Sequence, residues 1–179
     1  EAGARRFIAD GAKGFNITVP FKFDAYQLAD SVSDNARLAE AVNTIDVLAN
    51  GELFGDNTDG PGLVTDITDN LSWQLRGKRI LVLGAGGAVR GVLGSLLAAE
   101  PEQVHLWNRT PAKSAALVDQ FEGPLGFTTS AELESDYDLV INGTSAGLTG
   151  RLPAIPARVI GRDSHVYDMV YSQQATDFN

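Results

Sequence analysis

The stretch VLGAGGAVRG, residues 82–91, decides how the second half of this 179-residue chain folds. An apolar run leads into it, and a helix-like run, AVRGVLGSLLAAE, leads out of it. Gly84 allows a tight turn between the two, and Gly86 lets the backbone approach a pyrophosphate at the positive end of the helix. Val89 takes the third place of the G-x-G-x-x-G/A pattern, where Gly or Ala is usual. The stretch predicts a dinucleotide-binding turn, with a purely structural turn as the alternative.

The residues after the next predicted strand indicate which dinucleotide is bound. An NAD site places an acid about 20 residues after the glycines, where it holds the ribose 2′-hydroxyl. Here the sequence reads WNRTPAKS, residues 107–114, with Arg109 and Lys113 but no acid. A guanidinium binds a 2′-phosphate in two-point geometry and can stack on adenine. We therefore predict NADP(H) rather than NAD; the alternative is that both cations are solvated charges at a helix start.

Strands alternate with helices from Lys78 onward. Strand-like QVHLWNRT precedes helix-like PAKSAALVDQF, and further buried strands are predicted over residues 138–142 and 165–171. Near-continuous apolar strands between helices are typical of a parallel sheet covered on both faces. We predict an α/β fold of two lobes: a substrate-binding lobe over residues 1–75, and a Rossmann-like, doubly wound dinucleotide-binding domain over residues 76–179.

The first lobe has a more mixed pattern. We predict a helix end within the first 13 residues, a strand over 15–19, and two helices in FKFDAYQLAD and SDNARLAEA. Ser33 or Asp34 is the expected N-cap of the second helix. Two strand-like runs join at Asn50-Gly51, which predicts a hairpin with a type I′ turn. The spacing of Leu63, Ile67 and Leu71 predicts a helix that leaves this lobe.

Composition excludes several classes of protein. The chain has no cysteine, which excludes disulfides and thiolate chemistry, and its two histidines argue against a multi-histidine metal site, so no metal is predicted. A net charge of −9 argues against a nucleic-acid binder. No apolar run is long enough to span a membrane, and no signal peptide is visible, so we expect a cytoplasmic protein. The chain does not begin with Met, which is typical of a fragment or a processed product.

Lys22 and Asp59 are the candidates for proton transfer. Reduction of a carbonyl by hydride leaves an oxygen that needs a proton, and without cysteine the donors left are chiefly Lys, Asp and Tyr. Lys22 follows the end of a predicted strand, and Asp59 lies in the polar turn GDNTDG, residues 55–60. A carboxylate beside a lysine holds and orients the ammonium. The pattern alone favours a surface lysine at position 22 and a helix N-cap at position 59.

Six motifs occur in an order that resembles the shikimate dehydrogenase family: NITVPFK, AVNT, GDNTDG, GAGGAVRG, NRT and YDMVY. The resemblance covers almost the whole chain. It implies NADPH-dependent, reversible reduction of 3-dehydroshikimate to shikimate, a step of chorismate and aromatic amino-acid biosynthesis. It also implies that Lys22 and Asp59 are the catalytic pair.

The same resemblance implies the remaining site residues. Thr18, Asn43 and Asp59 match residues that hydrogen-bond the substrate hydroxyls, and Tyr171 matches one near the substrate carboxylate. The alternatives are a strand residue for Thr18, a turn for Asn43, core packing for Met169 and a helix cap for Asp34. The residues that match cofactor-binding positions are Asp34, Gly84, Ala85, Gly86, Gly87, Ala88, Asn108, Arg109, Thr110, Lys113, Thr144, Ser145 and Met169.

The chain departs from the family pattern at its ends. The family begins with a further strand carrying a Ser-x-Ser pair and ends with a further helix; this chain starts after the first and stops before the second. Phe23 and Gly143 also differ from the usual residues. We therefore keep as alternatives a truncated chain that binds NADP but turns over poorly, and a quinate or shikimate dehydrogenase relative that uses NAD. The expected partner is a small-molecule substrate, and a homodimer is left open.

Overall fold

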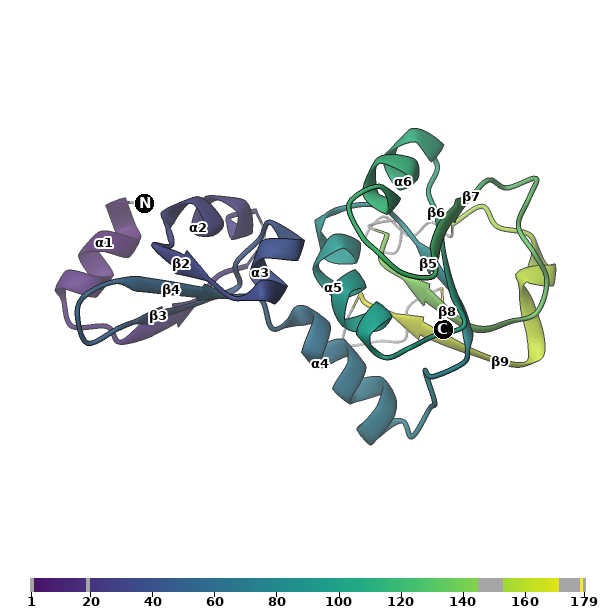
Figure 1. Ribbon diagram of the computed structural model, residues 1–179, viewed down its shortest axis with the longest axis horizontal. Coiled ribbons are helices and arrows are strands. Elements are labelled where there is room, and N and C mark those ends of the chain that lie inside the picture. The colour runs from purple at the N-terminus through teal and green to yellow at the C-terminus, as the bar shows by residue number, and fades with distance from the viewer. Residues whose placement is uncertain (1, 19, 145–152, 171–177, 179) are drawn as a thin grey trace.

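The computed structural model describes residues 2–18, 20–144, 153–170 and 178. Its strands form two separate sheets, and Figure 1 shows them in two lobes joined by helix α4. We call the part with the first sheet (residues 2–56) the small lobe and the part with the second sheet (residues 79–168) the large lobe. The division at residues 75 and 76 that the sequence suggests remains a proposal.

The small lobe is a four-stranded sheet with helices packed against it. Only β2 and β4 run parallel, and the other neighbours are antiparallel. Its core is aliphatic, built around Val42, Ile45 and Leu53. In spatial order its strands are β1 (Gly14–Asn16), β3 (Thr44–Val47), β4 (Leu53–Asp56) and β2 (Ser31–Val32), and its helices are α1 (Ala2–Ala9), α2 (Lys22–Leu28) and α3 (Asp34–Ala39).

The β3–β4 hairpin is present, but the predicted type I′ turn is wrong. That turn needs a positive φ at both central residues; Gly51 has φ +88°, whereas Asn50 is not among the residues with positive φ. Gly51 N–H donates to the Leu48 carbonyl at 2.8 Å, and Leu48 N–H donates to the Glu52 carbonyl at 2.9 Å. The loop is therefore one residue longer than predicted, with glycine in the left-handed position.

The large lobe confirms the predicted parallel sheet. All of its strand pairs are parallel, and the order places β5 between β6 and β8, so the chain builds outward on one side and then returns to build on the other. In such sheets ligands bind beyond the carboxyl ends of the strands where the direction of winding changes. Here that place lies between the ends of β5 and β8. In spatial order the strands are β7 (Leu125–Thr128), β6 (Gln103–Trp107), β5 (Arg79–Leu83), β8 (Tyr137–Asn142) and β9 (Ile160–Asp168).

Both faces of the large sheet are buried, which explains the apolar strands. Leu81 and Leu83 face one cluster with Trp107 and Tyr137, whereas Ile80 and Val82 face the other cluster. The cluster that contains Ile80 and Val82 also contains residues of the helices that cover this face of the sheet. The helices of this lobe are α5 (Gly87–Ala98), α6 (Pro111–Val118) and the single turn η3 (Ala157–Val159).

The link between the lobes is helical. Helix α4 (Asp59–Thr65) begins three residues after β4 and packs along α5, as Figure 1 shows. It continues into a π-helix, η1 (Asp66–Asn70), so the single regular helix expected here changes its winding midway. None of the helices in the described ranges is long and apolar enough to cross a membrane.

Some predicted strand limits are wrong. The strand predicted over 15–19 ends at Asn16, although the Ile17 N–H still donates to the Asn43 carbonyl at 2.7 Å, which is the next position in the register of β1 and β3. The strand predicted over 165–171 begins earlier, at Ile160, and ends at Asp168. Strands β2 and β7 were not predicted, since two and four residues with little alternation carry almost no pattern.

Candidate active site

An ion pair between Lys22 and Asp59 lies where the two lobes meet. Lys22 is the first residue of α2, after the turn at Pro20 and Phe21, and Asp59 is the first residue of α4. The Lys22 Nζ and Asp59 Oδ2 atoms are 2.6 Å apart, and their side chains are 26% and 31% exposed. A contact this short between partly buried charges holds the ammonium in one place while leaving it reachable. Their catalytic roles remain a prediction.

Asn43 completes the surroundings of the carboxylate. Its Nδ2 donates to Asp59 Oδ1 at 2.8 Å, so one oxygen of Asp59 faces the lysine and the other faces an amide. The Asn43 Oδ1 accepts from the Thr58 N–H at 3.1 Å and from the Thr44 hydroxyl at 3.0 Å. Because every bond has a defined direction, the carboxylate cannot turn freely.

Backbone hydrogen bonds bring the predicted substrate residues side by side. The Val42 N–H donates to the Lys22 carbonyl at 2.9 Å, and the Ile17 N–H donates to the Asn43 carbonyl. Thr18, which is exposed, therefore lies beside Asn43 at the same edge. The exposed Thr18 hydroxyl and the half-buried Asn43 amide next to an ammonium suit a polyhydroxylated ligand, because a ligand that left such a polar group unpaired would bind less well.

The ion pair is set against the large lobe by a close helix crossing. A Cβ on Gly60 would come within 2.5 Å of Ser95 Oγ and 3.0 Å of the Gly91 carbonyl, so only glycine lets α4 lie this close to α5. Asp59 Oδ2 is 3.7 Å from the position of a Cβ on Gly91. Gly91 lies about one turn beyond Gly87, where α5 begins. The catalytic candidates are thus held one helical turn from the glycine turn.

The glycine turn has the shape of a phosphate-binding loop. Gly84 has φ +113°, and a Cβ there would meet the Gly143 carbonyl at 3.1 Å. Among the described residues, a Cβ on Gly86 or Gly87 would meet no atom within 4 Å, so these residues leave the backbone N–H groups at the start of α5 uncovered on that side. Ala88 is exposed and Ala85 is half-buried. This arrangement fits a pyrophosphate on the helix N-terminus.

Val89 and Gly143 fit each other. Val89 is fully buried on the first turn of α5, and Gly143 follows β8. A Cβ on Gly143 would come within 2.5 Å of Val89 Cγ2. The third glycine of the usual pattern keeps helix and strand close; here the larger residue is on the helix and the glycine is on the facing loop.

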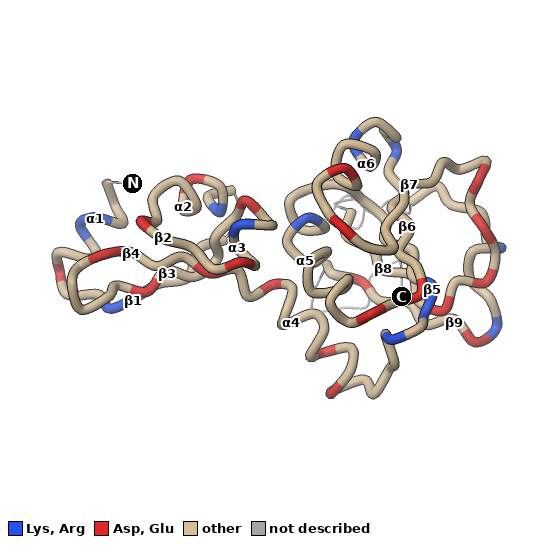
Figure 2. The backbone as a smooth tube through the Cα atoms, in the orientation of Figure 1, with Lys and Arg blue, Asp and Glu red and all other residues tan. Residues whose placement is uncertain are grey.

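The segment after β6 presents two exposed cations. Arg109 and Lys113 are exposed, and within the described part of the chain neither pairs with a carboxylate. Asn108 Nδ2 donates to the Thr110 carbonyl at 3.0 Å, which fixes the turn before α6, and the first turn of α6 has no acid. Figure 2 shows basic positions at this end of α6. Exposed cations beside the glycine turn fit a 2′-phosphate.

The ends of β8 and β9 are tied together by a buried amide. Asn142, which is fully buried, donates from Nδ2 to Asp168 Oδ1 at 3.0 Å, and its Oδ1 accepts from the Thr144 hydroxyl at 2.7 Å and the Thr144 N–H at 3.1 Å. The Met169 N–H donates to the Asn142 carbonyl at 2.9 Å. A Cβ on Gly143 would lie 3.3 Å from the Met169 sulfur. Thr144 and Met169 are thus brought next to the glycine turn, as the resemblance implies, although their contacts with a cofactor remain predictions.

Three predicted residues are not brought to this site by any contact shown here. Ser145 and Tyr171 lie outside the described residues. Asp34 is the first residue of α3, 89% exposed, and its carboxylate accepts from Arg37 at 2.5 Å. Its N-cap alternative is wrong, because Ser33 is the cap: Ser33 Oγ accepts from the Ala36 N–H at 3.1 Å. A cofactor role for Asp34 remains a prediction.

The far end of the link is tied to the large lobe. The Tyr167 hydroxyl on β9 donates to Asp66 Oδ2 on η1 at 2.8 Å. Burial, and then the Asp66 hydrogen bond and charge, raise the pKa of Tyr167 to about 12. Hydrogen bonds from Asn70 and then Tyr167 lower the pKa of Asp66. These contacts fix α4 and η1 against β9, only two residues before Met169.

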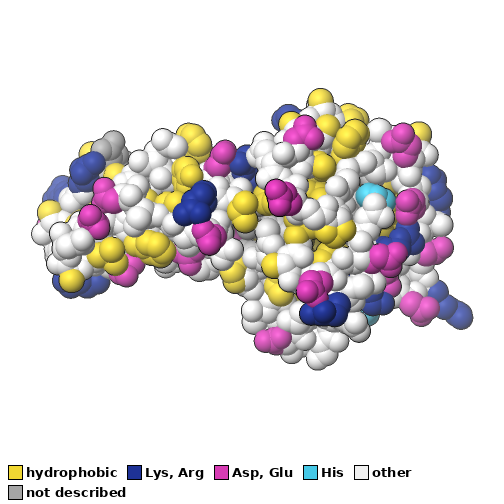
Figure 3. All heavy atoms as spheres, viewed as in Figure 1, with side chains coloured by type: hydrophobic (Ala, Val, Ile, Leu, Met, Phe, Trp, Pro, Cys, Tyr) yellow, Lys and Arg dark blue, Asp and Glu magenta, His cyan; other side chains and the backbone are white. Residues whose placement is uncertain are grey.

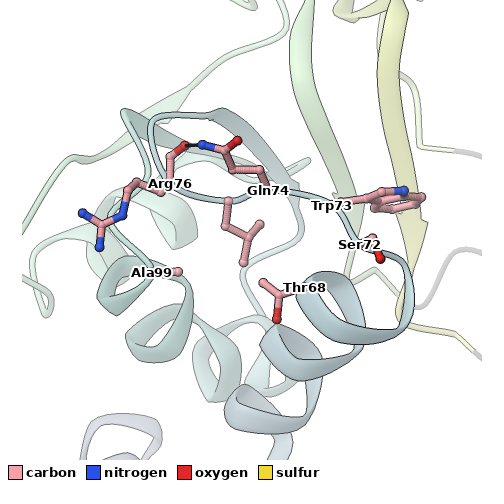
Figure 4. Close-up of a pocket in the computed structure, with 7 residues that line it drawn as sticks. Thr68, Ser72, Trp73, Gln74, Arg76 and Ala99 are labelled. Atoms are coloured by element: carbon pink, nitrogen blue, oxygen red, sulfur yellow. Dashed lines mark hydrogen bonds between the residues drawn. The ribbon is translucent and has the colours of Figure 1, made fainter.

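A surface pocket of about 400 Å³ lies at the opposite end of α5 from the glycine turn. Figure 4 shows its lining, in which Gln74 donates to the Arg76 carbonyl. Arg76 is paired with Glu100, so the pocket offers no unpaired charge from this side chain. Its position on the link, away from Lys22 and Asp59, separates it from the candidate active site. The lining residues are Thr68, Ser72, Trp73, Gln74, Leu75, Arg76 and Ala99.

Sequence reasoning missed Asn57 and Gly60, although both stand in the quoted motif GDNTDG. Asn57 is 1% exposed and bonds to Asp59, and Gly60 permits the helix crossing. The available signal was an Asn two residues before the catalytic candidate, a spacing at which Asn caps its own backbone. The contacts across the lobes carry no signal in the local pattern.

Comparison with known proteins gives consistent matches. Residues 1–45 match the protein-family model described as the shikimate dehydrogenase substrate binding domain, and residues 65–149 match the one described as shikimate / quinate 5-dehydrogenase. Two solved structures share the fold. The Ael1 enzyme of Pseudomonas putida has 42% identity and a TM-score of 0.93, with 99% of this chain and 66% of that chain covered. The shikimate 5-dehydrogenase of Thermus thermophilus, solved with NADP(H) and shikimate, has 34% identity and a TM-score of 0.81, with 94% and 62% covered.

Two curated relatives are NADP⁺-dependent shikimate dehydrogenases. The protein of Thioalkalivibrio sulfidiphilus is 48% identical over 178 residues, which cover 97% of this chain and 65% of that protein. The protein of Saccharophagus degradans is 46% identical over 187 residues, which cover 99% of this chain and 67% of that protein. The chain thus spans about two thirds of the length of these relatives. Together with the two matching family models and the geometry of the Lys22–Asp59 site, these matches show that the chain belongs to the shikimate dehydrogenase family.

Proposed function

We propose that this protein is an NADP-dependent shikimate dehydrogenase, which reversibly reduces 3-dehydroshikimate to shikimate. The single observation that carries the proposal is the Lys22–Asp59 pair, 2.6 Å long and packed one turn from the glycine turn on α5. The relatives that share this family carry the same activity in their names. Chorismate biosynthesis and a cytoplasmic location belong to the same proposal.

The residues of the chain suit this reaction. When bound, NADPH supplies the hydride that reduces the ring ketone. Lys22 Nζ donates a proton to the ketone oxygen as it becomes an alkoxide, and its charge stabilises that oxygen. Asp59 orients the ammonium through Oδ2, while Asn43 holds the other carboxylate oxygen. In the oxidative direction the same amine accepts the hydroxyl proton.

The groups that would hold the cofactor are present in the chain. The open backbone at Gly86 and Gly87 would bind the pyrophosphate. Arg109 and Lys113 would bind the 2′-phosphate, and Thr144 and Met169 would face the ribose and nicotinamide. An acid that would repel the 2′-phosphate does not occur in residues 107–114.

We expect the 179-residue chain to reduce NADP⁺ when shikimate is added, measured by NADPH absorbance. The assay compares this chain with the chain extended by the flanking segments that the relatives carry. Activity within about tenfold of the extended form supports a working enzyme. Binding of NADP⁺ without turnover, while the extended form is active, would favour the alternative of an impaired chain. Quinate and NAD⁺, tested in the same assay, show whether the chain is instead a quinate or shikimate dehydrogenase relative that uses NAD. Sedimentation velocity distinguishes a homodimer from a monomer.

Replacing Arg109 with alanine is expected to lower kcat/KM for NADP⁺ by about 10- to 100-fold, because a charge-assisted hydrogen bond to a phosphate is lost. The value for NAD⁺, which has no 2′-phosphate, should stay within about threefold. Arg162→Ala is the matched control, since it removes an exposed arginine on β9 and should change neither value. An equal loss with both cofactors would contradict a role in 2′-phosphate binding.

A further inference from the structure

We propose that Asn57 is a positioning residue of the reaction, which sets the orientation of both Asp59 and Asn43. The inference rests on the proposed function and names a residue to which the resemblance assigns no role. Asn57 touches neither reacting atoms nor cofactor in our scheme; it acts through the carboxylate and amide that surround Lys22.

Asn57 is a buried polar side chain with both of its polar atoms in use. It is 1% exposed, although it lies between an exposed residue, Thr58, and a half-buried one, Asp56. Its Oδ1 accepts from the Asp59 N–H at 3.1 Å, and its Nδ2 donates to the Ala41 carbonyl at 3.0 Å. Burial of an amide is favourable only when such partners are present. The position therefore requires one acceptor and one donor on the same side chain.

The acceptor end fixes the start of α4. Thr58 precedes the helix, but its side chain makes no capping hydrogen bond, so one of the free N–H groups of the first turn is satisfied by Asn57 instead. That N–H belongs to Asp59. The bond therefore sets the backbone from which the Asp59 carboxylate projects toward Lys22.

The donor end fixes the loop that carries Asn43. Ala41 is two residues before Asn43, and its carbonyl is held by Asn57 while the Asn43 N–H donates to the Asp56 carbonyl at 2.9 Å. Asn43 in turn donates to Asp59 Oδ1. The Asn57 side chain thus joins the start of α4 to the loop that carries Asn43. A displaced Asn57 side chain would therefore shift the Asp59 carboxylate both directly and through Asn43.

The large lobe contributes the third side of this junction. A Cβ on Gly91 of α5 would lie 3.6 Å from Asn57 Nδ2 and 3.8 Å from its Oδ1, almost the same distance as from Asp59 Oδ2. The amide and the carboxylate therefore pack against the same helix that begins at the glycine turn. Asn57 is placed to relate the proton-transfer groups to the cofactor-binding helix.

Asn57→Asp separates this positioning role from simple packing, because the two side chains have the same size. An ionised carboxylate can still accept from the Asp59 N–H, but its second oxygen would face the Ala41 carbonyl, and two acceptors repel. When protonated, the carboxyl can donate to that carbonyl as the amide does. Burial favours the protonated form, so the correct arrangement should return as the pH falls.

We expect kcat of Asn57→Asp for shikimate oxidation to be about 100-fold below the unsubstituted chain at pH of about 8, the loss that a small misplacement of catalytic groups produces. Relative to the unsubstituted chain at each pH, the loss should shrink toward pH of about 5.5, while the Kd for NADP⁺ stays within about twofold. The control is Asn50→Asp at the exposed hairpin turn, which should be neutral. A loss that is constant with pH, or no loss, would overturn the proposal.

A second measurement does not depend on activity or on the variant. In the unsubstituted chain the Asp59 amide should exchange with deuterium more slowly than the Thr58 amide. The acceptor of the Asp59 N–H is the buried Asn57 side chain, whereas the Thr58 N–H donates to the half-buried Asn43 side chain. Fast exchange at Asp59 would overturn the proposal even if Asn57→Asp fails to fold. Should the chain lack shikimate-dependent NADP⁺ reduction, the proposed function fails, while exchange at Asp59 still tests the role of Asn57 in holding the turn.

Discussion

Replacing Lys22 with methionine is expected to lower kcat by about 1000-fold in either direction, within the range that general acid–base catalysis contributes. Methionine has a similar length and fills the same partly buried space, but it can neither give nor take a proton. Asp59 keeps its hydrogen bond from Asn43, so the fold of the turn should survive. The Kd for NADP⁺, whose expected site is the glycine turn, should change by less than about threefold.

Lys13→Met is the matched control for this substitution. Lys13 belongs to the same lobe and forms no ion pair with an acid among the described residues, so its loss removes the same charge without touching the site. Steady-state kinetics with shikimate and titration with NADP⁺ measure the two effects separately. If Lys22→Met kept more than about a tenth of the activity, Lys22 would not be the proton donor.

Gly143→Ala is expected to destabilise the large lobe by about 1–3 kcal/mol, the usual cost of overpacking a tight contact. The new Cβ would lie 2.5 Å from Val89 Cγ2 and 3.3 Å from the Met169 sulfur. Relief requires α5 to move away from β8, which would also move the open N–H groups at Gly86 and Gly87. We therefore expect weaker binding of NADP⁺ as well as a lower free energy of unfolding.

Val89→Ala should reverse most of this effect, because it removes the atom that the new methyl group meets. By itself Val89→Ala leaves a small cavity and destabilises the chain, so the two substitutions should couple favourably by about 0.5–3 kcal/mol in a double-mutant cycle. Urea unfolding and NADP⁺ titration of the two single variants and the double variant measure the coupling. Strictly additive effects would show that the two residues do not share one packing space.

The large lobe could be predicted from sequence because its signals are local. Continuous apolar runs such as Arg79–Leu83 identify buried parallel strands, and glycines at the end of the run identify the turn. Strand β7 was not predicted because its sequence, LGFT, is short and contains glycine. Strand β1 ends earlier than its alternation suggests, although Ile17 still bonds to Asn43 in the register of β1 and β3. Alternation alone does not fix where a strand ends.

The residues of the candidate site likewise differ in whether a local sequence signal identifies them. Arg109 and Lys113 could be found from residue type and position alone, because a missing acid after the second strand has a direct chemical meaning. Lys22 and Asp59 were candidates from residue type, but by local pattern they are also a surface lysine and a helix start, and Asp59 does in fact begin α4. The resemblance was needed to prefer the catalytic interpretation. Asn57 was missed because its partner, Ala41, lies 16 residues away.

The attachment of α4 has a mechanical consequence. Since α4 and η1 are fixed to the large lobe through Gly60 and Tyr167, Asp59 travels with that lobe, whereas Lys22 travels with the small one. Figure 3 shows the small lobe meeting one side of the large lobe on this face. A rotation of one lobe against the other that kept both β4 and α4 intact would have to bend the chain at residues 57 and 58, and it would stretch the contact between Lys22 and Asp59. The distance between the Lys22 amine and the Asp59 carboxylate would therefore report how far the two lobes have rotated apart.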